Sequence, residues 1–151
     1  MHTLTDLPDA IQFLRGPEVA VLSTVDGEGR PSAACFWYLL GSDSNELTMQ
    51  IGAGSRTRHN IESNRWVSVV IARMRAPYYA LYIRGTASIG APLSLIERRA
   101  QAERYLGSAA EAYLRARPHV DAVTTRVKVE VASVYAGFKD ERRPDERGDT
   151  T

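Results

Sequence analysis

Residues 54–60, with the sequence GSRTRHN, gather hydrogen-bond donors at a point where a short helix is expected to begin. Gly54 allows a turn, Ser55 can cap the helix, and Arg56 and Thr57 follow in its first turn. The free amides and partial positive charge of a helix N-terminus form an anion site, which a guanidinium and a hydroxyl would complete. This pattern indicates a site for a phosphate monoester. A capped surface helix with solvated arginines is an equally good interpretation of this stretch alone.

The sequence lacks the patterns typical of common catalytic centres. It contains no G-x-S-x-G or H-E-x-x-H motif, and its single cysteine, Cys35, cannot form an intramolecular disulfide. The three histidines, His2, His59 and His119, are scattered along the chain. We therefore expect neither a hydrolase nor a metal centre, and we assign no catalytic residue.

The elements that must position residues 54–60 are mostly strands. A leading helix is expected within residues 5–17, where Gly16 and Pro17 end it. Apolar runs bounded by turn residues predict five strands before residue 90, and the strict alternation in RVKVEV (126–131) predicts a sixth. The five earlier strands are expected at residues 19–25, 30–40, 47–52, 66–72 and 78–89.

Two helices are expected between the fifth and sixth strands. Ser94 with Glu97, and Ser108 with Glu111, each have the spacing of a capping box, which predicts helices over residues 94–106 and 108–116. Six mostly antiparallel strands with connecting helices favour a closed or nearly closed barrel, because closure removes exposed strand edges.

Composition indicates the class of protein. A chain of 151 residues, 44% apolar and 25% charged, fits one domain, expected over residues 1–139. The charged residues 140–151 are expected to be disordered. A net charge of +1 argues against a nucleic-acid-binding surface, and no run of about 18 apolar residues suggests a membrane span. We expect a cytoplasmic protein.

Several segments, in order, resemble the pyridoxamine 5'-phosphate oxidase-like family of FMN-binding split barrels. LSTVDGEGRPSAACFWYLL (22–40) is similar to the family's first hairpin. LTMQIGAGSRTRHNIESNRWVSVVI (47–71) is similar to its strand, S-R-K-x-x-N/Q-L segment, polar helix and next strand, and YYALYIRGTASI (78–89) to the strand that follows. The resemblance implies a mainly β fold: a six-stranded antiparallel split β-barrel with peripheral short α-helices.

The resemblance also implies a cofactor site between two subunits of a homodimer. It places the flavin phosphate at Ser55 and Arg56, and the family lysine that follows is replaced by Thr57, so Arg58 would have to compensate. Aromatic and polar strand residues would lie along the ring system, and two residues would come from the facing subunit. The strand residues are Phe36, Trp37, Gln50 and Ile51, the helix adds Asn60, and the facing subunit supplies Tyr79 and Ala80.

The resemblance implies an oxidoreductase that transfers a hydride between bound FMN or the deazaflavin coenzyme F-420 and an unidentified small organic acceptor. Ala34 replaces an arginine of the pyridoxamine phosphate oxidases proper, and their C-terminal tryptophan–arginine segment is missing, so vitamin B6 oxidation is not expected. Arg58, Arg73 and Arg75 could receive an acidic cofactor tail, which favours the deazaflavin. The alternative is a binding module that holds a flavin, a deazaflavin or haem without turnover.

Overall fold

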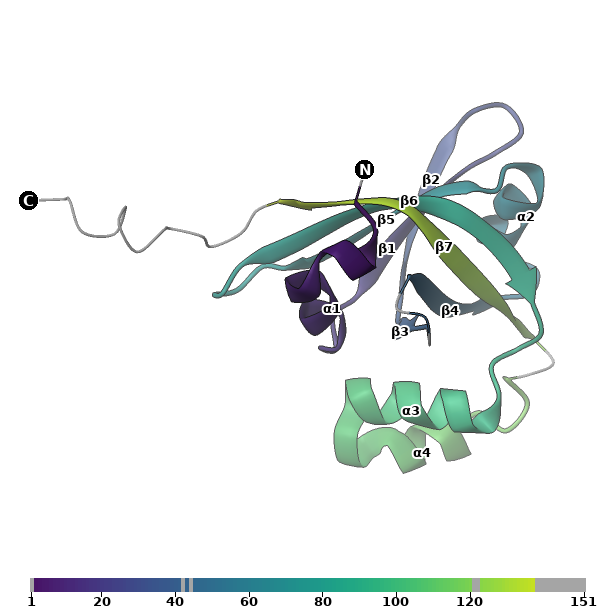
Figure 1. The fold of residues 1–151 in the computed structure, drawn as a ribbon. Coiled ribbons are helices and arrows are strands. Elements are labelled where there is room, and N and C mark those ends of the chain that lie inside the picture. The colour runs from purple at the N-terminus through teal and green to yellow at the C-terminus, as the bar shows by residue number, and fades with distance from the viewer. Residues whose placement is uncertain (1, 42, 44, 121–122, 138–151) are drawn as a thin grey trace, which may run out of the picture.

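One curled antiparallel sheet organises the protein (Figure 1). The computed structural model describes residues 2–41, 43, 45–120 and 123–137; the tail predicted to be disordered, residues 140–151, lies outside this range. Within these residues the sheet has seven strands in the order β2-β1-β5-β6-β7-β4-β3. The strands are β1 (Ala20–Val25), β2 (Pro31–Phe36), β3 (Leu39–Leu40), β4 (Glu46–Gly52), β5 (Trp66–Arg73), β6 (Tyr79–Gly90) and β7 (Thr124–Gly137).

The predicted mainly β, antiparallel split barrel is confirmed, with seven strands in place of six. The expected strand 30–40 is interrupted at Trp37 and Tyr38, so that β2 pairs with β1 whereas β3 pairs with β4. The interruption is caused by a contact with helix α3 (Leu95–Leu106). Tyr38 is fully buried, and its backbone N–H donates to the hydroxyl of Tyr105, 3.2 Å away, instead of to a strand.

The glycine turn between β1 and β2 is held by Asp26. Its Oδ1 accepts from the backbone N–H groups of Glu28 (2.8 Å) and Arg30 (2.9 Å), and Gly29 adopts a φ of 80°, which favours glycine. The bond from the Arg30 backbone is the main reason that the pKa of Asp26 falls to about 2. This turn fixes the register in which Ala20 faces Phe36.

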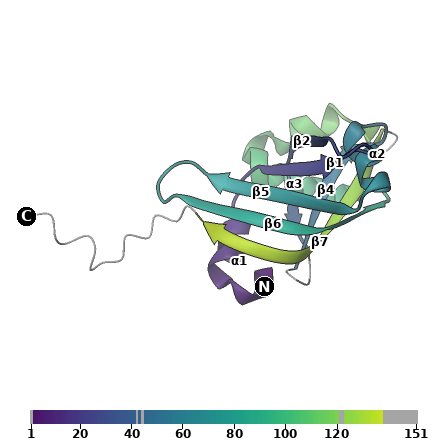
Figure 2. The ribbon, with the colours of Figure 1, turned by 90° about the horizontal axis from the view of Figure 1, so that it is seen from above.

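The core lies inside the curl of the sheet. Alternate residues of β1, β4, β5, β6 and β7 point inward. The short helix α1 (Pro8–Leu14), preceded by a 3₁₀ turn (Leu4–Asp6), covers one opening with Phe13 and Leu14. Seen from above in Figure 2, none of the helices in the described part of the chain covers the opposite, outer face of β1, β5, β6 and β7.

Two helices join β6 to β7 and lie below β3 and β4 in Figure 1. They are α3 (Leu95–Leu106) and α4 (Ala110–Arg115), linked by a 3₁₀ turn (Gly107–Ala109). The capping box of Ser94 and Glu97 is confirmed, because each side chain accepts a bond from the other's backbone N–H. The predicted box of Ser108 with Glu111 is wrong. The 3₁₀ turn places Ala109 at the N-cap, and Glu111 forms an ion pair with Arg99 of α3.

The long pairing of β6 with β7 contains one irregularity, between Arg84 and Gly85, where the register shifts. Gly85 lies so close to β7 that a Cβ atom there would be 2.2 Å from the carbonyl oxygen of Glu130. The bulge bends the strands where the sheet curls, and it requires glycine at position 85 of β6.

We expect Gly85→Ala to lower the free energy of unfolding by about 2 kcal/mol, because the added methyl forces two backbones apart. Gly27→Ala is the control, since no atom lies within 4 Å of a Cβ at that position. Urea denaturation followed by circular dichroism measures both variants. Equal stability of Gly85→Ala and the parent would contradict this account of the bulge.

Candidate functional site

The loop after β4 leads into helix α2 (Arg56–Ser63), which begins as the sequence predicts. Ser55 is extended (φ −75°, ψ 157°), and its Oγ accepts a hydrogen bond from the backbone N–H of Arg58, 3.2 Å away. The serine is therefore the N-cap of the helix. Its hydroxyl proton, and the backbone N–H groups of Arg56 and Thr57, which have no acceptor within the helix, are left to donate elsewhere.

Arg56 stands exposed in the first turn of α2. Its guanidinium makes neither a hydrogen bond nor an ion pair with any residue in the described part of the chain. An unpaired arginine beside the amide groups of a helix N-terminus gives this point a local positive potential. The first turn of α2 thus retains the anion-binding properties that its sequence predicts.

The two neighbouring residues are less available than the sequence suggests. Arg58 is half-buried: its Nε donates to Glu62 (2.9 Å) and its Nη1 to the carbonyl of Ala53 (3.1 Å). Thr57 is 9% exposed and turns inward. Replacing the missing lysine with Arg58 would therefore require the arginine to leave Glu62 and the loop that it now holds.

Asn60 has a structural contact. Its Nδ2 donates to Oγ1 of Thr24 on β1 at 3.0 Å, and both residues are buried. This bond ties the buried side of α2 to the barrel. Because a buried donor that loses its partner remains desolvated, the pair fixes the position of the helix and hence that of Ser55 and Arg56.

We expect Asn60→Ala to lower the free energy of unfolding by about 1–3 kcal/mol, since it leaves the Thr24 hydroxyl buried without this partner. Thr24→Val removes the other half of the bond. The double variant should cost clearly less than the sum of the two single variants, because the second change removes a bond already broken. Additive costs in urea denaturation would show that the two side chains do not act as a pair.

A groove of about 420 Å³ opens where β2 ends, beside β4 and the two helices α3 and α4. It brings together three of the predicted ring-contacting residues, Phe36, Trp37 and Gln50. Ile51, the fourth, is 2% exposed and its side chain belongs to the core. The other lining residues are Val19, Cys35, Gln101 and Tyr113.

Trp37 packs against one aromatic ring of each helix, Tyr105 of α3 and Tyr113 of α4. Its ring stacks on Tyr105 with 4.8 Å between centroids and 5° between planes, and Tyr113 lies 5.3 Å away at 43°. The guanidinium of Arg104 lies 4.9 Å from the centre of the Tyr105 ring. One face of Trp37 is therefore covered within the chain, so a ligand can reach only its remaining surface.

The helices are also fixed to the sheet by charge. Arg126 of β7 donates to both carboxylate oxygens of Glu97, at 2.8 and 2.5 Å. These bonds are the main reason that the pKa of Glu97 lies below its ordinary value. Burial raises the pKa of the Tyr38 phenol, so this tyrosine is a poor proton donor near neutral pH.

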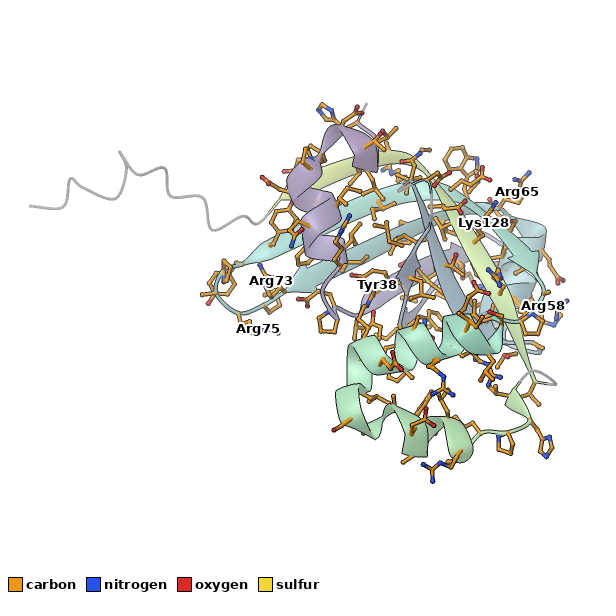
Figure 3. The ribbon with its side chains drawn as sticks, turned by 60° about the horizontal axis from the view of Figure 1, so that its bottom comes forward. Tyr38, Arg58, Arg65, Arg73, Arg75 and Lys128 are labelled. Carbon is orange, nitrogen blue, oxygen red and sulfur yellow. The ribbon has the colours of Figure 1, made fainter. Side chains whose placement is uncertain are left out.

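The remaining predicted residues lie at the other end of β5 and β6. Tyr79 faces Arg73 across the sheet and its ring lies 4.6 Å from that of Phe13. Ala80, beside it, is buried. Figure 3 shows Arg73 and Arg75 far from Arg58, at the opposite end of the sheet. One chain therefore does not bring Tyr79 or Ala80 to α2.

Arg73 and Arg75 share one acidic partner within the protein. Both guanidinium groups lie 3.9 Å from Oε1 of the largely buried Glu18, and Nε of Arg73 donates to the carbonyl of Pro77 at 2.7 Å. Part of the charge that the sequence offers to an acidic tail is thus already balanced inside the protein.

Comparison with known proteins identifies the family. A sequence profile described as pyridoxamine 5'-phosphate oxidase matches residues 7–136, nearly the whole described barrel. The chain belongs to the pyridoxamine 5'-phosphate oxidase family. The search of curated proteins returned no match.

Solved structures share the fold of this family member at low sequence identity. The conserved hypothetical protein Rv2991 from Mycobacterium tuberculosis has a TM-score of 0.69 and 15% identity over 89% of this chain and 85% of its own. An F-420 reductase has a TM-score of 0.60 and 18% identity, covering 82% and 94%. The haem storage protein HutZ from Vibrio cholerae has a TM-score of 0.61 and 18% identity, covering 91% and 96%. Proteins with this architecture therefore include both a reductase and a haem-storage protein.

Sequence reasoning missed the contribution of α3 and α4 to the groove. Arg98, Gln101 and Tyr105 are three and four residues apart, so they share one face of α3 beside the buried Ala102. Polar residues at helical spacing on the buried face were the available signal.

Among the described residues, no helix is both long and apolar enough to cross a membrane.

Proposed function

We propose that this protein binds FMN or coenzyme F-420 through its phosphate at Ser55 and Arg56, and transfers a hydride between the cofactor and a small organic acceptor. The observation that carries the proposal is the exposed, unpaired Arg56 at the capped N-terminus of α2. A phosphate there accepts from the guanidinium, the serine hydroxyl and the free amides of the first turn.

The rest of the site fits a planar cofactor attached to that phosphate. β4 carries Gln50 into the groove and leads within a few residues to Ser55, so one strand links the ring-contacting and phosphate-binding residues. The cofactor itself supplies the hydride chemistry. The aromatic residues of the groove would orient the ring and exclude water from one side of it.

Neither cofactor is favoured by the charges in one chain. The sequence suggests that Arg58, Arg73 and Arg75 receive an acidic deazaflavin tail, but Glu62 and Glu18 already lie beside them. An acidic tail would therefore gain less from these arginines than it would from free ones. Parallel titrations with FMN and coenzyme F-420 decide between the two.

The second candidate is a binding module without turnover, which the fold shared with the haem storage protein HutZ supports. The three histidines of this chain are exposed, and none lines the groove beside Trp37. A haem ligated by histidine would therefore have to lie elsewhere on the surface, whereas Cys35 and Tyr113 are the groove residues that could ligate its iron. Absorbance of the purified protein, followed by an acceptor assay with reduced cofactor, separates a coloured binding protein from an oxidoreductase.

We expect Arg56→Ala to weaken binding of the cofactor by about 2 kcal/mol, roughly thirtyfold, with folding little changed. The change removes a charge-assisted bond to the phosphate, and Arg56 has no partner in the protein to lose. Arg65→Ala, at an exposed position just after α2, is the control. Fluorescence titration with each cofactor measures both variants. Equal affinities for the parent and Arg56→Ala, for both cofactors, would contradict the phosphate site and favour the alternative interpretation of residues 54–60, a capped surface helix with solvated arginines.

We further propose a homodimer with the cofactor between subunits, because Tyr79 and Ala80 can reach α2 only from a second copy. The apolar, aromatic run CFWYLL (35–40) holds more apolar surface than one barrel interior is expected to bury, which predicts a subunit contact there, but Tyr38 is fully buried. Three exposed aromatic residues, Trp66, Tyr82 and Tyr135, instead alternate with the core residues of β5, β6 and β7, and so form an outer aromatic face on the side of the sheet away from the core. Surface of this kind is typical of subunit contacts.

Light scattering at micromolar concentration should give the mass of a dimer for the parent. Tyr135→Glu should shift the protein toward monomer, because it places a charge in the outer aromatic face, where Tyr135 pairs with Tyr82 at 5.8 Å. Ile96→Glu is the control, since Ile96 is an exposed apolar residue of α3, outside that face. A monomeric parent with cofactor present would overturn the dimer.

A further inference from the structure

Two side-chain amides of the groove have polar atoms whose hydrogen-bonding capacity is unmet. Oε1 of Gln50 on β4 and Nε2 of Gln101 on α3 are both buried, and neither has a partner among the described residues. Gln101 as a whole is only 7% exposed. Leaving such a group without a partner costs about 1–3 kcal/mol, so its retention in a folded protein calls for an explanation.

Both amides lie where a ligand could meet them. Gln50, Gln101 and Tyr113 line the 420 Å³ groove and also a second hollow of about 20 Å³ between β4 and the two helices. The second hollow holds roughly one water molecule, so a larger ligand must enter from the groove. Trp37 and Tyr113 supply aromatic walls there, which suit a flat ligand.

We propose that Gln50 and Gln101 recognise the edge of a planar heterocycle that carries a carbonyl next to an N–H, as an imide or lactam does. Nε2 of Gln101 donates to the carbonyl, and Oε1 of Gln50 accepts from the N–H. Rotating both amides by half a turn exchanges the two roles and keeps one donor and one acceptor. Gln101 is thereby a specificity-determining residue supplied by α3.

This edge has two sources, and the inference rests on the proposed function only for the first. The pyrimidine part of a flavin or deazaflavin ring carries it, and so does an imide or lactam ligand that binds in the groove on its own account. The recognition chemistry is the same. If the cofactor ring supplies the edge, bound cofactor already occupies the two amides. If a separate ligand supplies it, the amides remain free when the cofactor is bound.

The variant that tests the site is Gln101→Met, which keeps the size of the side chain and removes the amide. Because the Nε2 atom has no partner in the protein, thermal unfolding without ligand should be unchanged or shifted upward. A glutamine with a purely structural role would instead lower the melting temperature when it is replaced. Gln12→Met, at an exposed position of α1, is the matched control.

The first binding measurement uses riboflavin, which has the ring without the phosphate, and 3-methylriboflavin, in which the N–H is blocked. If the ring edge is recognised, Gln101→Met should weaken riboflavin binding about tenfold, and the parent should discriminate similarly against the methylated ring. Gln12→Met should bind both as the parent does. Fluorescence quenching gives each affinity.

The second measurement titrates uracil and 1,3-dimethyluracil into FMN-loaded protein by calorimetry. Loss of uracil binding in Gln101→Met, with riboflavin binding unaffected, assigns the edge to a substrate. Insensitivity of every probe to both Gln101→Met and methylation, or failure of the parent to bind any probe, overturns the proposal. FMN binding that depends on Arg56, combined with riboflavin and uracil binding that are both unaffected by Gln101→Met, overturns this inference alone. Uracil binding that depends on Gln101 in a protein without affinity for FMN overturns the proposed function alone.

Discussion

The hydroxyl group of Tyr105 is the contact on which the candidate site depends. It donates to the carbonyl of Glu18 at 2.5 Å, and it accepts from the backbone N–H of Tyr38 and from Nη2 of Arg104. One side chain of α3 thus satisfies backbone groups of two separate segments, one just before β1 and one just after β2. These bonds join the helices to the barrel at the point where the chain leaves β2, beside the groove.

The same junction explains how the groove and the first turn of α2 are connected. The break at Trp37 and Tyr38 turns the chain from β2 to β3, which places Trp37 against α3 and pairs β3 with β4. β4 then carries Gln50 past the groove and delivers Ser55 to the start of α2. A phosphate-binding turn and an aromatic slot are therefore linked by a single strand, whose seven-residue ladder with β7 keeps their spacing constant.

Local sequence patterns predicted most of the fold. Alternating apolar residues located the long strands, and Ser55 and Ser94 were correctly identified as helix caps because caps depend on neighbours three residues away. The break in strand 30–40 could not be predicted, since the cause is Tyr105, 67 residues from Tyr38. The same holds for Gln101: its place on a helix was predicted, but its position beside Gln50 depends on how the helices dock. For Arg73 and Arg75, only the fold reveals that Glu18 lies between them.

The place of α3 and α4 in the chain has an evolutionary consequence. Helices α3 and α4 are inserted between β6 and β7, two strands that pair directly with each other along most of their length. Because the ladder closes without them, these helices can change length or sequence while the strand pairing persists. The two helices nevertheless supply Gln101 and Tyr113 to the groove. A barrel of this design can therefore acquire a new ligand preference through changes in one inserted segment. Related proteins that arise in this way would bind different ligands while their sheets keep the same strand arrangement.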